Sequence, residues 1–105
     1  MHLPAFTDRF NALLGASEDL SDQQSPRPWG LLPLRAAMAR QGFKLSRGQL
    51  SNLRAGVTKN PSGYVLLAIS STLSVDVRVF FDEGIFADEL RRLTFERDAR
   101  RGHEL

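Results

Sequence analysis

Residues 46–62 read S-R-G-Q-L-S-N-L-R-A-G-V-T-K-N-P-S. Within this stretch, Leu50 and Leu53 are spaced so that both lie on one face of a helix. Ser46 is a candidate N-cap, because its hydroxyl can accept a backbone N–H from the first turn. Gly56 is a suitable residue to end a helix. The stretch therefore predicts a short helix that begins after Ser46 and ends at Gly56.

Five further helices are predicted on either side of this one. In them, apolar residues recur three or four positions apart, the period of a helix with one buried face. The predicted segments are residues 4–14, 31–41, 62–74 and 76–81, and a last helix that starts near residues 82–84 and runs toward Arg100. No alternating strand pattern longer than V-R-V-F-F occurs. We therefore expect an all-α fold, a five- to six-helix bundle.

Two sets of apolar residues in the C-terminal third are core candidates. The first set is Val77, Phe80 and Phe81. The second set is the stripe Phe86, Leu90 and Leu93, which Ile85 and Phe95 extend. This stripe is equally suited to the interior of one chain and to an interface between two copies, and both interpretations stay open. Residues 84–105 are accordingly a candidate dimerisation element beside a domain that comprises residues 1–83.

Residues 15–30 are polar and rich in turn-forming residues, and they end in S-P-R-P-W-G. Gly15 is expected to end the first helix, whose Pro4 suits a first turn. The segment that follows is predicted to be a loop. Its single Trp29 is expected to anchor the loop to the core, because a buried indole contributes a large apolar area.

Composition narrows the class of protein. A chain of 105 residues is sufficient for one domain, and 42% of its residues are hydrophobic. The absence of cysteine excludes disulfides and thiolate metal sites. Neither a signal peptide nor an apolar run long enough to span a membrane is apparent. We therefore expect a cytoplasmic protein without contact to a membrane.

The charges are unevenly distributed, although the net charge is only +2. No Asp or Glu occurs between Asp22 and Asp76. This acid-free interval holds seven basic residues: Arg27, Arg35, Arg40, Lys44, Arg47, Arg54 and Lys59. A basic middle between ends of mixed charge is typical of a surface that binds phosphates. The acids Glu18, Asp19 and Asp22 are expected to lie away from that surface.

The side chains on the short helix suit the recognition of DNA bases. Arg47 can donate two N–H groups to guanine O6 and N7, and Asn52 or Gln49 can make the paired contact to adenine. Cations nearby would bind phosphates and fix the register without reading sequence. They are Arg35, Lys44, Arg54 and Lys59, and the Ser46 hydroxyl is added to this phosphate set. Two helices joined by a turn, the second with polar side chains that can read bases, constitute a helix-turn-helix.

The sequence L-S-N-L-R-A-G followed by K-N-P-S resembles the XRE family of helix-turn-helix regulators, the class of the lambdoid phage repressors. Within this family it is most similar to the EspR-like mycobacterial regulators, whose pattern L-S-x-L-R-x-G-x-x-x-N-P-S-G is matched by residues 50–63. The resemblance covers roughly residues 5–83. It implies a lambda-repressor-like fold, binding to double-stranded DNA as a homodimer, and dimerisation through a C-terminal helical region.

The resemblance also implies roles for individual positions. The base-reading positions of the family fall on Arg47, Gly48 and Asn52, with Gln49 and Ser51 beside them. Its phosphate-contacting positions fall on Thr58, Lys59 and Asn60. The chain departs from the family at Gly48, which has no side chain to read a base. It also departs in the turn G-F-K-L-S, which is longer than usual.

The sequence therefore predicts a sequence-specific, nucleoid-associated transcriptional regulator. Phe86, Leu90 and Leu93 are the candidate dimer contacts. The alternative is a protein-interaction adaptor, or an antitoxin-like module, that binds a protein partner through its last helix. We expect no enzyme, no catalytic residue, no metal and no cofactor, because His2 and His103 lie at the termini and no phosphate-binding glycine loop occurs.

Overall fold

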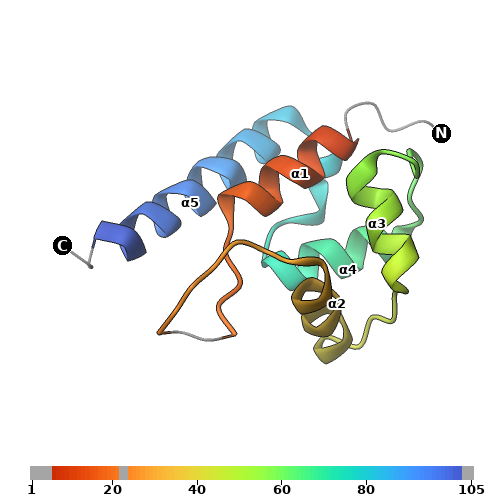
Figure 1. Ribbon diagram of the computed structural model, residues 1–105. Coiled ribbons are helices and arrows are strands. Elements are labelled where there is room, and N and C mark those ends of the chain that lie inside the picture. The colour runs from red at the N-terminus through yellow and green to blue at the C-terminus, as the bar shows by residue number, and fades with distance from the viewer. Residues whose placement is uncertain (1–5, 22–23, 103–105) are drawn as a thin grey trace.

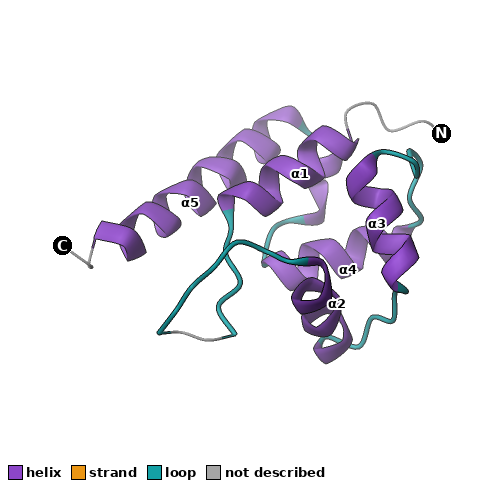
Figure 2. Ribbon diagram, viewed as in Figure 1, coloured by secondary structure: helices purple, strands orange, loops and turns teal. Residues whose placement is uncertain are grey.

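The helices of this protein begin and end close to the residues that the sequence predicts. The computed structural model describes residues 6–21 and 24–102 (Figures 1 and 2). Its elements are α1 (Phe6–Ala16), α2 (Leu31–Arg40), α3 (Arg47–Ala55), α4 (Gly63–Leu73), the 3-10 turn η1 (Val77–Phe80) and α5 (Glu83–Gly102). The only β pairing among these residues is an isolated bridge between Asp19 and Arg27. The prediction of an all-α fold is confirmed.

Four side chains fix the starts of helices by accepting backbone N–H groups that the helix itself leaves unpaired. Ser46 accepts from Gln49 at the start of α3, and Ser62 accepts from Val65 at the start of α4. Asp76 and Asp82 do the same for η1 and α5. Each of the four elements therefore begins at a residue whose own side chain caps it.

The helices form two layers around one apolar core. α1 lies beside α5, while α2, α3 and α4 form the other part of the molecule (Figure 1). Both parts contribute to the core, whose fully buried side chains include Phe10, Met38 and Leu50. Leu45, at the end of the α2–α3 connection, is buried in the same cluster, whereas Phe43 is partly buried against it. This arrangement leaves the outer side of α3 uncovered.

α5 is fixed to the rest of the molecule by arginine side chains as well as by the core. The Arg9 guanidinium on α1 donates to the backbone oxygen of Val79 at 2.7 Å and forms an ion pair with Glu83. It also lies 5.2 Å from the ring centroid of Phe86. Arg92 donates to the backbone oxygen of Ser74, which connects α5 to the end of α4.

The segment between α1 and α2 is a loop with defined attachments. The backbone of Asp19 pairs with that of Arg27 through two N–H···O bonds of 2.7 and 3.3 Å. The Trp29 indole N–H donates to the Ser17 hydroxyl at 3.0 Å, and the ring packs against the core. The prediction that Trp29 anchors this loop is confirmed.

Three local predictions are wrong. The helix α1 does not end at Gly15 but continues to Ala16, because the backbone N–H of Ser17 still donates to the carbonyl of Leu13, four residues back, as in a helix. Phe81 is not in the core but 57% exposed, since it follows the last residue of η1 and lies on its outer side. Phe95 is 75% exposed and does not extend the inner stripe of α5.

Several positions singled out in the sequence lie outside the described residues, namely His2, Pro4, Asp22 and His103. Within the described part of the chain, no helix is both long enough and apolar enough to cross a membrane.

Candidate nucleic-acid interface

α3 is a short helix with well-formed ends. The Ser46 hydroxyl accepts the N–H of Gln49 at 3.1 Å, and the Gln49 side-chain oxygen accepts the N–H of Ser46 at 2.7 Å. This reciprocal pair is a capping box. At the other end, Gly56 adopts a left-handed backbone with φ of 81°, and the carbonyl of Asn52 accepts N–H groups from Val57 and Thr58. Fixed ends hold the exposed side chains of α3 in defined positions.

The exposed side of α3 carries the predicted base readers. Leu50 and Leu53 are buried, whereas the predicted readers are all exposed: Arg47, Gln49, Ser51 and Asn52. A helical period of 3.6 residues places Gly48 and Ala55 near the centre of the exposed side, opposite the two leucines. The middle of the exposed side of α3 therefore carries only small residues, and the polar side chains lie on either side of it.

Gln49 has a structural role that limits its predicted one. Its amide oxygen is already the acceptor in the capping box. A paired contact to adenine needs both the oxygen and the N–H₂ group of the same amide. Because the Gln49 side chain is folded back onto the N–H of Ser46, we expect that it would have to leave the capping box to reach an adenine.

The connection between α2 and α3 is held by two side chains that the sequence did not mark for this role. The Tyr64 hydroxyl on α4 accepts the backbone N–H of Lys44 at 2.7 Å, and its ring meets Phe43 edge to face at 5.4 Å. The Arg35 Nε donates to the backbone oxygen of Leu45 at 3.0 Å. Arg35, predicted to bind phosphate, thus also fixes the turn, and only its terminal nitrogens remain for an anion.

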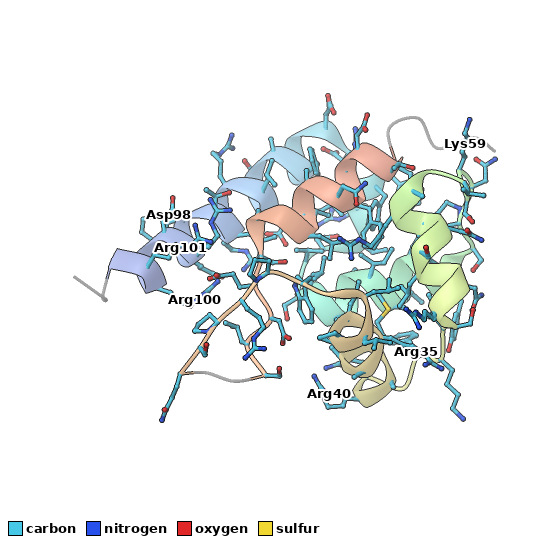
Figure 3. The ribbon with its side chains drawn as sticks, in the orientation of Figure 1. Arg35, Arg40, Lys59, Asp98, Arg100 and Arg101 are labelled. Carbon is cyan, nitrogen blue, oxygen red and sulfur yellow. The ribbon has the colours of Figure 1, made fainter. Side chains whose placement is uncertain are left out.

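The remaining predicted phosphate residues surround α3. Lys44 precedes it, Arg54 lies in its last turn, and Lys59 follows it, all exposed. Thr58 is partly buried and Asn60 is exposed. The Asn11 side chain on α1 donates to the backbone oxygen of Arg54, so that α1 supports this end of α3. Figure 3 shows Lys59 at the α3 end of the molecule and Arg100 and Arg101 at the far end of α5.

Ion pairing separates the basic residues into two groups. Outside the acid-free interval, seven arginines form ion pairs: Arg9, Arg78, Arg91, Arg92, Arg97, Arg100 and Arg101. The basic side chains within residues 35–59 are Arg35, Arg40, Lys44, Arg47, Arg54 and Lys59. None of them forms an ion pair with an acid of the described residues, although Arg40 lies near enough to Asp19 to lower its pKa. The side of the molecule that carries α3 therefore presents positive charge that the described part of the chain leaves uncompensated.

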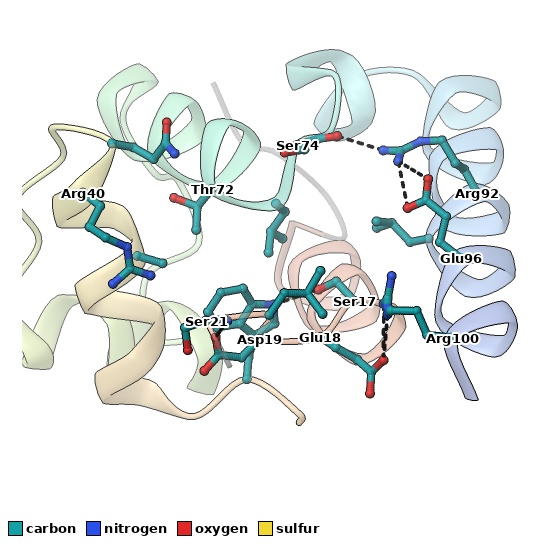
Figure 4. A pocket seen from close by; sticks show the side chains of 16 residues that line it. Ser17, Glu18, Asp19, Ser21, Arg40, Thr72, Ser74, Arg92, Glu96 and Arg100 are labelled. Carbon is teal, nitrogen blue, oxygen red and sulfur yellow. Dashed lines mark hydrogen bonds and ion pairs between the residues drawn. The ribbon is translucent and has the colours of Figure 1, made fainter. Parts of the chain in front are cut away.

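A polar cleft of about 380 Å³ lies between the loop, α2, the end of α4 and α5, and no residue of α3 lines it (Figure 4). Its charged groups largely pair with one another, as in Glu18 with Arg100 and Arg92 with Glu96. Burial alone would raise the pKa of Asp19, but hydrogen bonds from Ser21 and the nearby Arg27 and Arg40 bring that pKa below 3.8. These pairs explain the cleft as a structural junction. Glu18 and Asp19 are buried at this junction, where they lie near the loop and α5 and not near α3.

The predicted dimer residues occupy different environments. Leu93 is 6% exposed and belongs to the core of its own chain, whereas Phe86 and Leu90 are partly buried against that core. Among the described residues no group of three acidic or histidine side chains could hold a metal ion.

No protein-family model matches the sequence, and no curated protein matches it significantly.

Proposed function

We propose that α2, residues 41–46 and α3 form a helix-turn-helix, and that the protein is a sequence-specific DNA-binding transcriptional regulator. α3 enters the major groove, and a homodimer reads two half-sites, because one short helix reaches only a few base pairs. The observation that carries this proposal is the exposed polar side of α3, surrounded by cations without acidic partners. Uncompensated cations around a protruding helix suit a polyanion with a groove.

The roles follow from donor geometry. Arg47 and Asn52 are the base readers, for guanine and adenine respectively, and each good paired contact provides about 1–3 kcal/mol of discrimination. Ser51 and Gln49 lie beside them. The phosphate set comprises Arg35, Lys44, Ser46, Arg54, Thr58, Lys59 and Asn60. The likeness of residues 50–63 to the XRE family, and to its EspR-like members, supports the same assignment.

The experiment is a mobility-shift titration with a duplex selected from random DNA and with an unrelated duplex, over a range of salt concentrations. Arg47→Ala is expected to remove most of the preference for the selected duplex while salt-dependent binding to both remains. Arg78→Ala is the matched control, since Arg78 is an exposed arginine paired with Asp76 on η1, outside the proposed interface. It should leave both affinities unchanged.

Two outcomes would contradict this proposal. If Arg47→Ala weakened binding to both duplexes equally, Arg47 would be a phosphate contact and not a base reader. If the protein bound no duplex even at low salt, the adaptor or antitoxin-like alternative would remain. The exposed Phe81 and Phe95 favour that alternative, because large exposed aromatic side chains are typical of protein contacts.

A further inference from the structure

We propose that the outer side of α2 binds a medium-chain fatty carboxylate, and that this ligand competes with DNA for the two cations beside it. The acyl chain lies in a groove along α2, and the carboxylate pairs with Arg35 and Lys44. The site itself requires no DNA, and only the competition rests on the proposed function.

The α2 groove has a volume of about 370 Å³ and lies between α2 and the turn that follows it. Its wall on α2 is formed by Leu32, Ala36 and Ala39, which recur at helical spacing. All three are exposed, Leu32 at 55%. Phe43 lines the groove from the turn, and its ring packs edge to face against Tyr64. Because the two alanines carry no atom beyond Cβ, an acyl chain can lie directly on the helix between Leu32 and Phe43.

The charge of the α2 groove is carried by two cations from the side of the turn. Arg35 and Lys44 both line the groove, and none of the described residues that line it is an acid. The Arg35 Nε donates to the backbone oxygen of Leu45 at 3.0 Å, so that its terminal nitrogens remain for an anion. Arg40, the next cation of α2, instead lines the polar cleft. An apolar groove with cations at one edge suits a molecule that has one anionic end and one apolar chain.

The size of the α2 groove suits a small molecule. From Leu32 to Ala39 the helix rises about 10 Å at about 1.5 Å per residue. An extended chain of roughly eight to ten carbons has this length, given C–C bonds of about 1.5 Å. The volume also lies within the range of small-molecule sites, roughly 300–1,000 Å³. A protein segment in so short a groove would bury far less than the ~1,200 Å² of a specific interface, so that a protein is the less suitable partner.

Occupation of the α2 groove has a consequence for DNA binding. Arg35 and Lys44 both belong to the proposed phosphate set, and a carboxylate between them neutralises charge that would otherwise contact phosphate. The groove includes no residue of α3, so that Arg47 and Asn52 stay uncovered. A bound fatty carboxylate should therefore weaken binding to all duplexes and leave the sequence preference unchanged.

Calorimetric titration of the full chain with decanoate, below the concentration at which it forms micelles, tests the site. Octanoate should bind several-fold more weakly than decanoate, since each fully buried methylene group provides up to about four-fold in affinity. Decyltrimethylammonium, which has the same chain and a positive head, should not bind measurably, because the two cations repel it. In NMR spectra decanoate should shift the amide signals of residues 32–45, and shifts confined to α5 would overturn the site.

Variants that fill the groove provide a second test. Ala39→Leu places a larger side chain in the path of the acyl chain and should weaken decanoate binding about ten-fold, as should Ala36→Leu. Ala99→Leu, at an exposed position of α5, is the matched control and should leave this binding unchanged. Lys44→Gln removes one cation and should weaken decanoate binding about five-fold. Helix content measured by circular dichroism verifies that each variant folds.

The competition is tested by mobility-shift titrations with and without decanoate. Decanoate should lower the affinity of the unmodified protein for selected and unrelated duplexes about three-fold or more. Ala39→Leu, which lies outside the phosphate set, should bind DNA as before and respond little to decanoate.

The possible failures are distinguishable. A protein that binds no decanoate, or an Ala39→Leu variant that binds it as well as the unmodified protein, would overturn the site. Binding to phosphatidylglycerol vesicles without binding to free decanoate would also overturn it, because the ligand would then be a membrane surface. Decanoate binding that leaves the affinity for DNA unchanged would overturn the competition. Failure to bind any duplex would contradict the proposed function and leave the carboxylate site intact.

Discussion

The Tyr64 hydroxyl accepts the backbone N–H of Lys44 at 2.7 Å, and this bond joins α4 to the turn that leads into α3. Tyr64→Phe keeps the ring against Phe43 and removes only the acceptor. We expect a loss of stability of about 0.5–1.5 kcal/mol, the net contribution of one hydrogen bond. Urea unfolding measures this loss, and DNA affinity should fall with it because α3 is less well positioned.

Leu67, which is exposed on α4 one turn further on, provides the control for Tyr64. Leu67→Ala should change the affinity for DNA less than Tyr64→Phe does. Equal DNA affinity in Tyr64→Phe and the unmodified protein would show that the turn needs no such support.

Gly48 lowers the stability of α3, and no tight contact with a neighbouring residue requires a glycine at this position. A Cβ at this position would meet only the Ser46 hydroxyl, at 3.9 Å. Gly48→Ala should therefore raise the stability by about 0.5–1 kcal/mol, the usual difference between alanine and glycine within a helix. If the helix backbone approaches the bases closely, the same methyl group should lower the affinity for DNA. Thermal melting and mobility-shift titration measure the two effects, and a gain in both would contradict close approach.

Lys59 is expected to contact phosphate and to read no base. Lys59→Ala should weaken binding to selected and unrelated duplexes alike and reduce the slope of log affinity against log salt by about 1. Competition titrations at four or more salt concentrations give this slope. A change confined to the selected duplex would identify Lys59 as a reader.

Glu89 makes stability depend on pH. Its hydrogen bond from Arg92 lowers its pKa below 4.5, against an opposing effect of burial, and the N–H of Asp76 lowers it further. A lowered pKa in the folded state means that the stabilisation is complete above pH 4.5 and is lost as the pH falls through the folded value. Glu89→Gln should cost roughly 1–2 kcal/mol at pH 7 and progressively less toward pH 3. A cost that stayed constant with pH would exclude this linkage.

Asp76 provides a comparison at lower pH. Hydrogen bonds from Arg78 lower its pKa from 3.8 to about 2. The contribution of the Asp76 carboxylate to the free energy of unfolding should therefore persist at pH 4 and be lost as the pH falls from 4 to 2. Unfolding curves of Asp76→Asn and Glu89→Gln across this range should consequently differ in the pH at which each variant converges with the unmodified protein.

Glu18 holds the loop to the end of α5. Its side chain is buried, and it pairs with Arg100 and Arg101, which are themselves partly exposed. Glu18→Gln should cost about 1 kcal/mol, because the arginines can turn to water. The single Trp29 reports the local effect: its fluorescence should shift to longer wavelength if the loop detaches. Glu96→Gln, which removes a partner of Arg92 instead, should leave that emission unchanged.

Much of this fold could be predicted because its signals are local. The spacing of Leu50 and Leu53, the Ser46 cap and Gly56 define α3 by themselves. Predictions of burial were wrong where contacts between residues far apart in the sequence determine which side chains are covered. Phe81 and Phe95 have the composition of core residues, but only the packing of α5 against α1 and η1 shows that they point outward.

The exposure of the proposed base readers on α3 could be predicted from the sequence, but the contacts that support this helix could not. The spacing of Leu50 and Leu53 indicates which side of α3 is buried, and the acid-free interval indicates which part of the chain carries unpaired positive charge. The contributions of Tyr64 and Asn11 come from α4 and α1, 20 and 43 residues from their partners. No spacing rule connects residues so far apart. The second use of Gln49 was also visible only in the structure, although the S-x-x-Q pattern of a capping box was present in the sequence.

The capping box at the start of α3 has a consequence for any operator that this protein binds. If Gln49 turned to an adenine, the helix would lose a cap contribution of about 1 kcal/mol, comparable with the discrimination that the new contact provides. The two effects would nearly cancel. The base pair beneath Gln49 should then tolerate all four letters, so that aligned binding sites show an uninformative column between well-defined ones.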